Sequence, residues 1–192
     1  MTIKYVIEGP KGVGKSTLAQ MLRDKGKVDL STHFSGEWDK LLTNDVLESN
    51  HQSKLYHVHD RGYLSNFIYS FVTPLSSIFS PYQESYNGTM GQLTFHRPVT
   101  LADFDDYMSK VERLVVLYVS DVKLLQDRLN ERLDNKNKGY TTNEWETLSV
   151  TNDLFKGMLP FLRHRYGHKV IAINVSDYDS IESVYDMILA YE

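Results

Sequence analysis

The chain has 192 residues and no cysteine, with 41% hydrophobic and 24% charged residues. These values favour one compact domain and exclude a disordered chain, a disulfide framework, thiolate catalysis and a Cys-based zinc site. The sequence has no apolar run of membrane-spanning length and a formal net charge of −4, so we expect neither a membrane helix nor nucleic-acid binding through the overall charge. The lack of cysteine suits a reducing compartment, and we expect a cytoplasmic location.

The first half of the chain alternates strand and helix patterns. The expected elements are, in chain order, a buried strand at 3–7, a helix at 15–25, a strand near 28–34, a helix at 37–48 and a strand at 55–59. In the first helix, Leu18, Ala19 and Leu22 share one stripe that predicts its buried face. Residues 65–72 have helical spacing, after which prolines and glycines break the chain into turns.

The second half continues the alternation. Its expected elements are a helix at 101–110, a strand at 114–119, a helix from Asp121, a polar segment at 133–142, a helix at 143–165, a strand at 169–175 and a helix at 181–191. The polar segment has the composition of a mobile lid, and a plain surface loop would look similar. Alternating strands and helices predict a parallel sheet covered on both faces, with ligands at the carboxyl ends of its strands.

The strongest motif lies between the first expected strand and helix, where residues 9–16 read GPKGVGKS and match G-x-x-x-x-G-K-[ST]. Its glycines let backbone N–H groups converge on phosphate oxygens at the positive end of the helix. We expect Lys15 to reach the β- and γ-phosphates of ATP and Ser16 to ligate Mg²⁺. The expected ATP-binding residues are Gly9, Lys11, Gly12, Val13, Gly14, Lys15, Ser16 and Thr17. The alternative is a chance glycine turn, and a GTPase is disfavoured because the N-K-x-D motif is absent.

A second motif, Asp60-Arg61-Gly62, follows the third expected strand. At that edge of the sheet Asp60 is expected near the Mg²⁺, and Arg61 is expected to project toward a phosphate acceptor. A lone Asp-Arg pair is often only a surface ion pair. Because this pair follows the phosphate loop in the chain, a functional role is favoured over a surface ion pair.

Together these motifs resemble the thymidylate kinase and deoxynucleoside kinase branch of the P-loop kinases. The resemblance follows the element order of nearly the whole chain and is carried by IEG…GKST at 7–17, DRGYLS at 60–65, and Arg128 with Arg132. It implies an α/β, three-layer P-loop NTPase fold: a parallel sheet of about five strands, helices on both faces, and a lid. It further implies that residues 1–192 form a single kinase domain.

The resemblance also implies roles for particular segments. The lid would span about 128–142 and the acceptor-binding insertion about 65–110. Arg61 would hold the acceptor's phosphate or 5′ oxygen. Arg128 and Arg132 lie four apart on one helix face and would close over ATP, although a solvated charged face would show the same spacing.

The chain departs from the family in two places. The usual Glu-Pro pair after the second strand is not found, and Thr32-His33-Phe34 or Glu37-Trp38 stands in that neighbourhood. Lys11 occupies a loop position where thymidylate kinases more often place an acid. A monophosphate acceptor needs no strong general base, so the missing pair favours it; a nucleoside hydroxyl would gain from a base, for which the candidates are Glu8, Glu37 and Asp60.

Five further side chains are candidate ligands by residue type. Phe67 and Phe71 share a helical face that could stack an acceptor base or belong to the core, and Arg97 could bind an acceptor phosphate. His57 and His59 share one face of a strand, but no further ligands have suitable spacing, so packing is favoured over a metal site.

The sequence thus predicts an ATP- and Mg²⁺-dependent deoxynucleoside monophosphate kinase that acts on a small-molecule nucleotide or nucleoside. The alternatives are a deoxynucleoside kinase, or another P-loop kinase acting on a hydroxyl, and a nucleotide-binding regulator without transfer activity. A homodimer is compatible with the sequence.

Overall fold

The computed structural model describes residues 3–25, 30–33, 57–65, 67–69, 72, 100–134 and 142–191. Several sequence expectations lie outside these ranges: the helix at 37–48, the turns before residue 100, and most of the polar segment at 133–142. Arg97, Phe71 and Glu37 also lie outside them.

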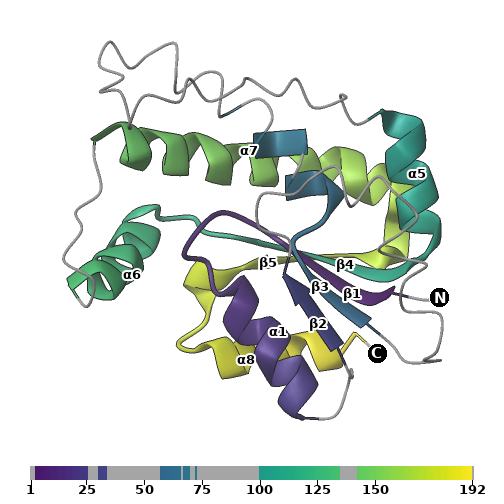
Figure 1. The fold of residues 1–192 in the computed structure, drawn as a ribbon, viewed down its shortest axis with the longest axis horizontal. Helices are drawn as coiled ribbons and strands as arrows, with labels where there is room; N and C mark the ends of the chain where they lie inside the picture. The colour runs from purple at the N-terminus through teal and green to yellow at the C-terminus, as the bar shows by residue number, and fades with distance from the viewer. Residues whose placement is uncertain are drawn as a thin grey trace, which may run out of the picture.

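A five-stranded parallel sheet forms the centre of the fold, in the order β2-β3-β1-β4-β5 (Figure 1). Its strands are β1 (Ile3–Glu8), β2 (Leu30–His33), β3 (His57–Asp60), β4 (Val111–Tyr118) and β5 (Val170–Asn174). The predicted sheet is therefore confirmed. β4 begins three residues before its expected start at 114, because Val111 already pairs with Ile3 of β1.

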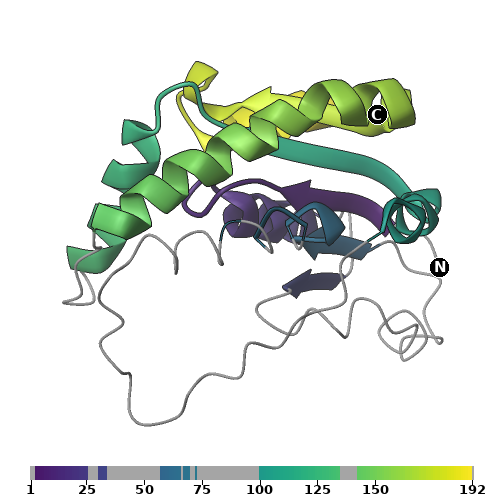
Figure 2. The ribbon, with the colours of Figure 1, turned by 90° about the horizontal axis from the view of Figure 1, so that it is seen from above.

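Helices cover both faces of the sheet, as expected. They are α1 (Lys15–Asp24), α5 (Leu101–Ser109), α6 (Lys123–Asp134), α7 (Thr142–Tyr166) and α8 (Ile181–Leu189). Figures 1 and 2 show α1 and α8 on one face and α5 and α7 on the other, which gives the three layers. In the described ranges, no helix combines membrane-spanning length with an apolar sequence.

Each face of the sheet has its own hydrophobic core, because successive strand residues point to opposite faces. Tyr5 and Ile7 of β1 pack with the α1 and α8 side, where Leu18, Ala19 and Leu22 form the predicted stripe. Val6 packs with the other side, against side chains of α5 and α7 such as Met108 and Phe155. Ile3 joins this second core because the register of β1 shifts between Ile3 and Tyr5. Burying one such large side chain contributes about 1.5–3 kcal/mol, so these two cores hold the strand ends in place.

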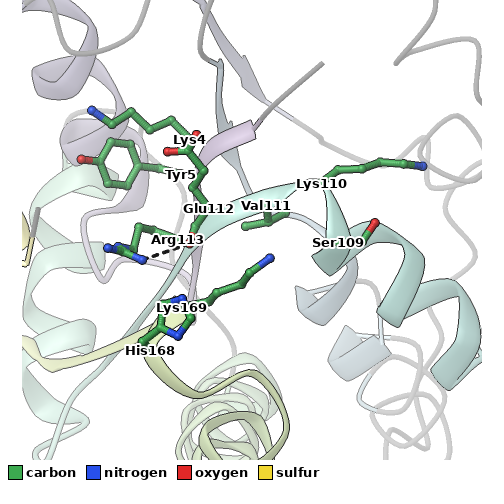
Figure 3. Close-up of a pocket in the computed structure, with 9 residues that line it drawn as sticks. All are labelled: Lys4, Tyr5, Ser109, Lys110, Val111, Glu112, Arg113, His168 and Lys169. Carbon is green, nitrogen blue, oxygen red and sulfur yellow. Dashed lines mark hydrogen bonds between the residues drawn. The ribbon is translucent and has the colours of Figure 1, made fainter.

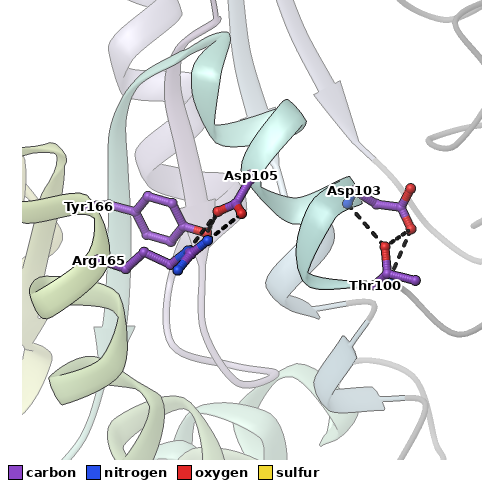
Figure 4. Close-up of polar contacts among 5 residues, drawn as sticks. All are labelled: Thr100, Asp103, Asp105, Arg165 and Tyr166. Atoms are coloured by element: carbon purple, nitrogen blue, oxygen red, sulfur yellow. Dashed lines mark hydrogen bonds and ion pairs between the residues drawn. The ribbon is translucent and has the colours of Figure 1, made fainter.

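Helix α5 is fixed at its start and at its middle (Figure 4). Thr100 and Asp103 form a capping box at its start, in which Asp103 N–H donates to Thr100 Oγ1 over 3.2 Å and Thr100 N–H donates to Asp103 Oδ2 over 3.0 Å. Asp105 accepts hydrogen bonds from Arg165 Nε at 2.7 Å and from the Tyr166 hydroxyl at 2.8 Å, which hold the pKa of Asp105 at about 2. These contacts join α5 to the end of α7.

Candidate active site

The phosphate loop lies between β1 and α1, the structural context that its motif requires. Gly14, the residue before α1, has a left-handed backbone with φ of 107°. Gly9 has φ of 146°, and a Cβ at this position would lie 2.4 Å from the Leu117 carbonyl oxygen of β4. No acidic residue occurs in the first turn of α1, so its positive end is left available for an anion.

The Lys15 side chain is buried against the loop. Its amine donates hydrogen bonds to the carbonyl oxygens of Gly9 at 2.8 Å and Pro10 at 2.7 Å. The ammonium group therefore lies against the backbone of the phosphate loop. Thr17 and Lys11 are exposed at the same loop and helix start.

Ser16 and Asp60 meet across the edge of the sheet. The Ser16 hydroxyl donates to Asp60 Oδ2 over 2.5 Å, and Asp60 is buried at the end of β3, where it pairs with Ile7 of β1. A hydroxyl and a carboxylate are hard oxygen donors of the kind that Mg²⁺ prefers, so these residues fit the predicted metal. No cluster of three acidic or histidine side chains occurs among the described residues, so a cation here would need phosphate and water oxygens as well.

Arg61 adopts an unusual backbone at the turn after β3. Its φ is 78°, and its N–H donates to the Ile7 carbonyl over 2.9 Å. The guanidinium carbon lies 5.5 Å from the ring centroid of Tyr69. Its Nε is buried and has no hydrogen-bond acceptor in the part of the chain that the structure describes. Arg61 therefore presents charge at the same sheet edge as the phosphate loop.

Glu8 is fully buried at the end of β1 and binds the helical residues that follow β3. Its Oε1 accepts the N–H groups of Leu64 at 3.1 Å and Ser65 at 3.2 Å, and its Oε2 accepts the Ser65 hydroxyl. Burial raises the pKa of Glu8 to about 7, against the lowering effect of the two hydrogen bonds from Ser65 and of the charges of Lys15 and Arg61. Since both oxygens are engaged, the geometry makes Glu8 a support for this helix start and does not favour it as a general base.

His59 belongs to the packing beneath this turn. Its Nδ1 lies 2.9 Å from the hydroxyl of Tyr107, a residue of α5, and both side chains are buried. A Cβ on Gly62 would lie 2.7 Å from that hydroxyl, so the turn packs directly on Tyr107. This arrangement supports the interpretation of His59 as a packing residue.

Of the other predicted site residues, one lies at the phosphate loop, one lines a cavity, and two have side chains outside the described part of the chain. Arg128 of α6 donates to the Val13 carbonyl of the phosphate loop over 3.4 Å, which brings the first predicted lid arginine to the loop. Arg132 lies in the same helix, but its side chain is outside the described part of the chain, as is all of Arg97. Phe67 lines an apolar cavity of about 420 Å³ between α5 and α7, and its predicted stacking on a base stays a prediction.

Another cavity, of about 470 Å³, lies at the amino ends of β1, β4 and β5, away from the phosphate loop (Figure 3). Several cations line it, but they point apart and have acceptors of their own. Lys169 Nζ donates to the Met108 carbonyl at 2.8 Å, Lys110 pairs with Asp106 at 2.8 Å, and Arg113 reaches the Tyr191 carbonyl at 3.3 Å. The groups suited to phosphate chemistry are at the opposite edge of the sheet.

Solved structures similar to this chain share its fold over almost its full length. Three structures of deoxyadenosine kinase from M. mycoides each align with 98% of this chain and 97% of their own, at 14% sequence identity. They contain dATP (TM-score 0.58), dCTP (0.54), and the products dCMP and a flexible dCDP (0.57). The chain shares the fold of these kinases. No protein-family model and no curated protein sequence matches it.

This fold agreement confirms the predicted three-layer α/β class. Two features of the candidate site were missed from the sequence. The sequence indicates Glu8 only as a candidate base, whereas its contacts with Leu64 and Ser65 make it a support. The sequence does not distinguish Tyr69 from its aromatic neighbours, because its contact with Arg61 accompanies a left-handed backbone at Arg61 that residue type does not indicate.

Proposed function

We propose that this protein is an ATP-dependent kinase that transfers the γ-phosphate of ATP to a deoxynucleoside-type acceptor. The observation that carries the proposal is the hydrogen bond between Ser16 and Asp60, because it joins the phosphate loop to the turn that presents Arg61. ATP phosphates and an acceptor oxygen would then meet at one edge of the sheet.

The chain's own groups have separate tasks in this proposal. The loop N–H groups and Lys15 bind the phosphates, and Arg61 orients the acceptor. Ser16 and Asp60 would hold Mg²⁺, which when bound offsets phosphate charge. Arg128, at the loop, and Arg132 would form part of a lid at about 128–142, within one kinase domain that carries its acceptor region at about 65–110.

The acceptor we place first is a free deoxynucleoside. The fold similarity to deoxyadenosine kinase, one structure of which holds the product dCMP, supports this choice. The sequence favoured a deoxynucleoside monophosphate, and the charge of Arg61 also suits that acceptor, so a thymidylate-kinase-like activity is the second candidate. A regulator that binds ATP without transfer is the third.

A turnover screen separates these candidates. The purified protein, with Mg²⁺ and ATP, is assayed for ADP release and phosphorylated product against the four deoxynucleosides and their monophosphates. Turnover with nucleosides supports the first candidate, and turnover only with monophosphates supports the second. Magnesium-dependent ATP binding without any turnover would leave only the regulator. Lys15→Ala is the matched control, because it removes the ammonium group that lies against the loop.

We also propose that the protein forms a homodimer through α7. Val150, Leu154 and Phe161 share one face of this helix and are 44%, 36% and 39% exposed. The first half of α7 carries Glu146 and Asp153, whereas the second half is basic, so two antiparallel copies would pair opposite charges. Light scattering tests this: the wild type should have twice the mass of Leu154→Glu, and a monomeric wild type would refute it.

A further inference from the structure

Tyr69 contacts both halves of the candidate site. Its ring lies under the Arg61 guanidinium, with 5.5 Å between the guanidinium carbon and the ring centroid. The backbone N–H of Lys11, in the phosphate loop, lies near its hydroxyl and acts to lower the pKa of the phenol. The side chain is half-buried, and burial raises the pKa of its hydroxyl, so the phenol is neutral at ordinary pH.

The helical residues that carry Tyr69 are held at a second point. Glu8 binds the N–H groups of Leu64 and Ser65, and Tyr69 follows Ser65 by four residues, on the same helical face. The helix is therefore attached to β1 by Glu8 and to the phosphate loop by Tyr69. Phe67 lies between them in sequence but lines the cavity near α5 and α7, away from this face.

An aromatic ring is a suitable partner for an arginine that must bind a substrate. The ring face attracts the guanidinium but uses none of its N–H donors, whereas a carboxylate would occupy two donors and offset the charge. In the described part of the chain, Arg61 Nε has no hydrogen-bond acceptor, which agrees with a cation that is oriented by a ring. The left-handed backbone at Arg61 directs this side chain from its turn onto Tyr69.

We propose that Tyr69 is the positioning residue for Arg61: its ring orients the guanidinium toward the acceptor, and its hydroxyl fixes the phosphate loop at Lys11. This inference rests on the proposed function, because it assigns Arg61 to the acceptor. It divides the side chain into two parts with different effects. The ring affects kcat/KM for the acceptor, and the hydroxyl affects the KM for ATP.

Two substitutions separate the parts. Tyr69→Phe keeps the ring and removes the hydroxyl, and Tyr69→Leu removes both. Each is made in the wild type and in Arg61→Ala, and kcat and KM are measured for ATP and for the best acceptor of the turnover screen. Tyr191→Leu is the control, because Tyr191 is exposed at the opposite edge of the sheet.

In the wild-type background, both variants should raise the KM for ATP by about 3-fold, while only Tyr69→Leu should lower kcat/KM for the acceptor, by about 10-fold. In Arg61→Ala, the two variants should have equal acceptor kcat/KM, because the ring then has no guanidinium to orient. Thermal denaturation checks that each variant is folded, and Tyr69→Met replaces Tyr69→Leu should the latter not fold.

The outcomes distinguish this inference from the proposed function. Equal acceptor kcat/KM for the Phe and Leu variants, or a difference between them that persists in Arg61→Ala, would overturn the role of Tyr69 and leave the kinase activity in place. A wild type with no turnover on any acceptor would overturn both.

Discussion

The Ser16 hydroxyl donates a 2.5 Å hydrogen bond to Asp60 Oδ2, and this contact joins the first turn of α1 to the end of β3. The two residues are 44 positions apart in sequence. Because Asp60 is buried and pairs with Ile7, its carboxylate is held by the sheet, whereas Ser16 is held by the helix that follows the phosphate loop. The contact therefore depends on both elements.

Removing either partner should weaken the response to Mg²⁺. We expect Ser16→Ala and Asp60→Asn to raise the Mg²⁺ concentration that gives half-maximal turnover by about 10–100-fold, because each removes an oxygen donor next to the phosphates. A magnesium titration at fixed ATP measures this. Ser109→Ala, at the opposite edge of the sheet, should leave the titration unchanged. Unaltered magnesium dependence in both variants would disprove the assignment.

Arg61 allows chemistry and backbone strain to be separated. Arg61→Ala and Arg61→Gly should lose acceptor kcat/KM alike, with little change in the KM for ATP, because both lack the guanidinium. Arg61→Gly should be more stable than Arg61→Ala by about 1 kcal/mol, since glycine adopts the observed φ of 78° without strain. Urea unfolding measures the difference. Equal stability of the two variants would contradict the left-handed backbone.

Glu8 should make stability depend on pH. Its pKa is raised from 4.5 to about 7 in the folded protein, so the native state keeps a proton that the unfolded state has lost. Stability that is present below pH 4.5 is therefore lost as the pH rises through about 7, a change of about 3 kcal/mol.

Glu8→Gln cannot titrate and can still accept the N–H groups of Leu64 and Ser65. Relative to the wild type, it should gain about 3 kcal/mol of unfolding free energy between pH 4 and pH 8, measured by urea titration. Glu112→Gln, at the start of β4, is the matched control and should follow the wild type. A constant difference between Glu8→Gln and wild type across this range would show that Glu8 has an ordinary pKa.

Gly62 tests the packing of the turn on α5. A Cβ at this position would lie 2.7 Å from the Tyr107 hydroxyl and 2.9 Å from the Val6 side chain, so Gly62→Ala should cost about 1–3 kcal/mol of stability. Tyr107→Phe removes the hydroxyl, so the cost of Gly62→Ala should be smaller in that background. A double-mutant cycle by urea unfolding measures the coupling. Strictly additive effects would mean that the turn does not press on Tyr107.

Local patterns were sufficient for the order of the elements that the structure describes. The apolar run of β1, the stripe of Leu18, Ala19 and Leu22 in α1, and the GPKGVGKS motif between them each specify structure within a few residues. These signals predicted the parallel sheet and the position of the phosphate loop. Helix and strand ends differed by up to three residues, because pairing partners such as Val111 and Ile3 determine where a strand begins.

The candidate site was predictable only where a motif named it. Lys15, Ser16 and Asp60 lie where the motifs indicated, whereas the roles of Glu8 and Tyr69 depend on residues far away in sequence, such as Ser65 and Lys11. Such contacts join residues that are distant in sequence, and one sequence carries no pattern for them. The left-handed Arg61 is of the same kind, since residue type alone would favour glycine there.

The pairing of β1 with β3 indicates one way in which this protein could misfold without losing its secondary structure. Ile7 lies opposite Asp60, and the ladder continues into the hydrogen bond from Arg61 N–H to the Ile7 carbonyl. A shift of β3 by one residue relative to β1 would turn Asp60 toward the other layer of helices, while most of the backbone pairing would be kept. A population of misaligned molecules would then look well folded by circular dichroism and yet be inert. Specific activity per folded molecule would reveal such errors sooner than any spectroscopic measure of secondary structure.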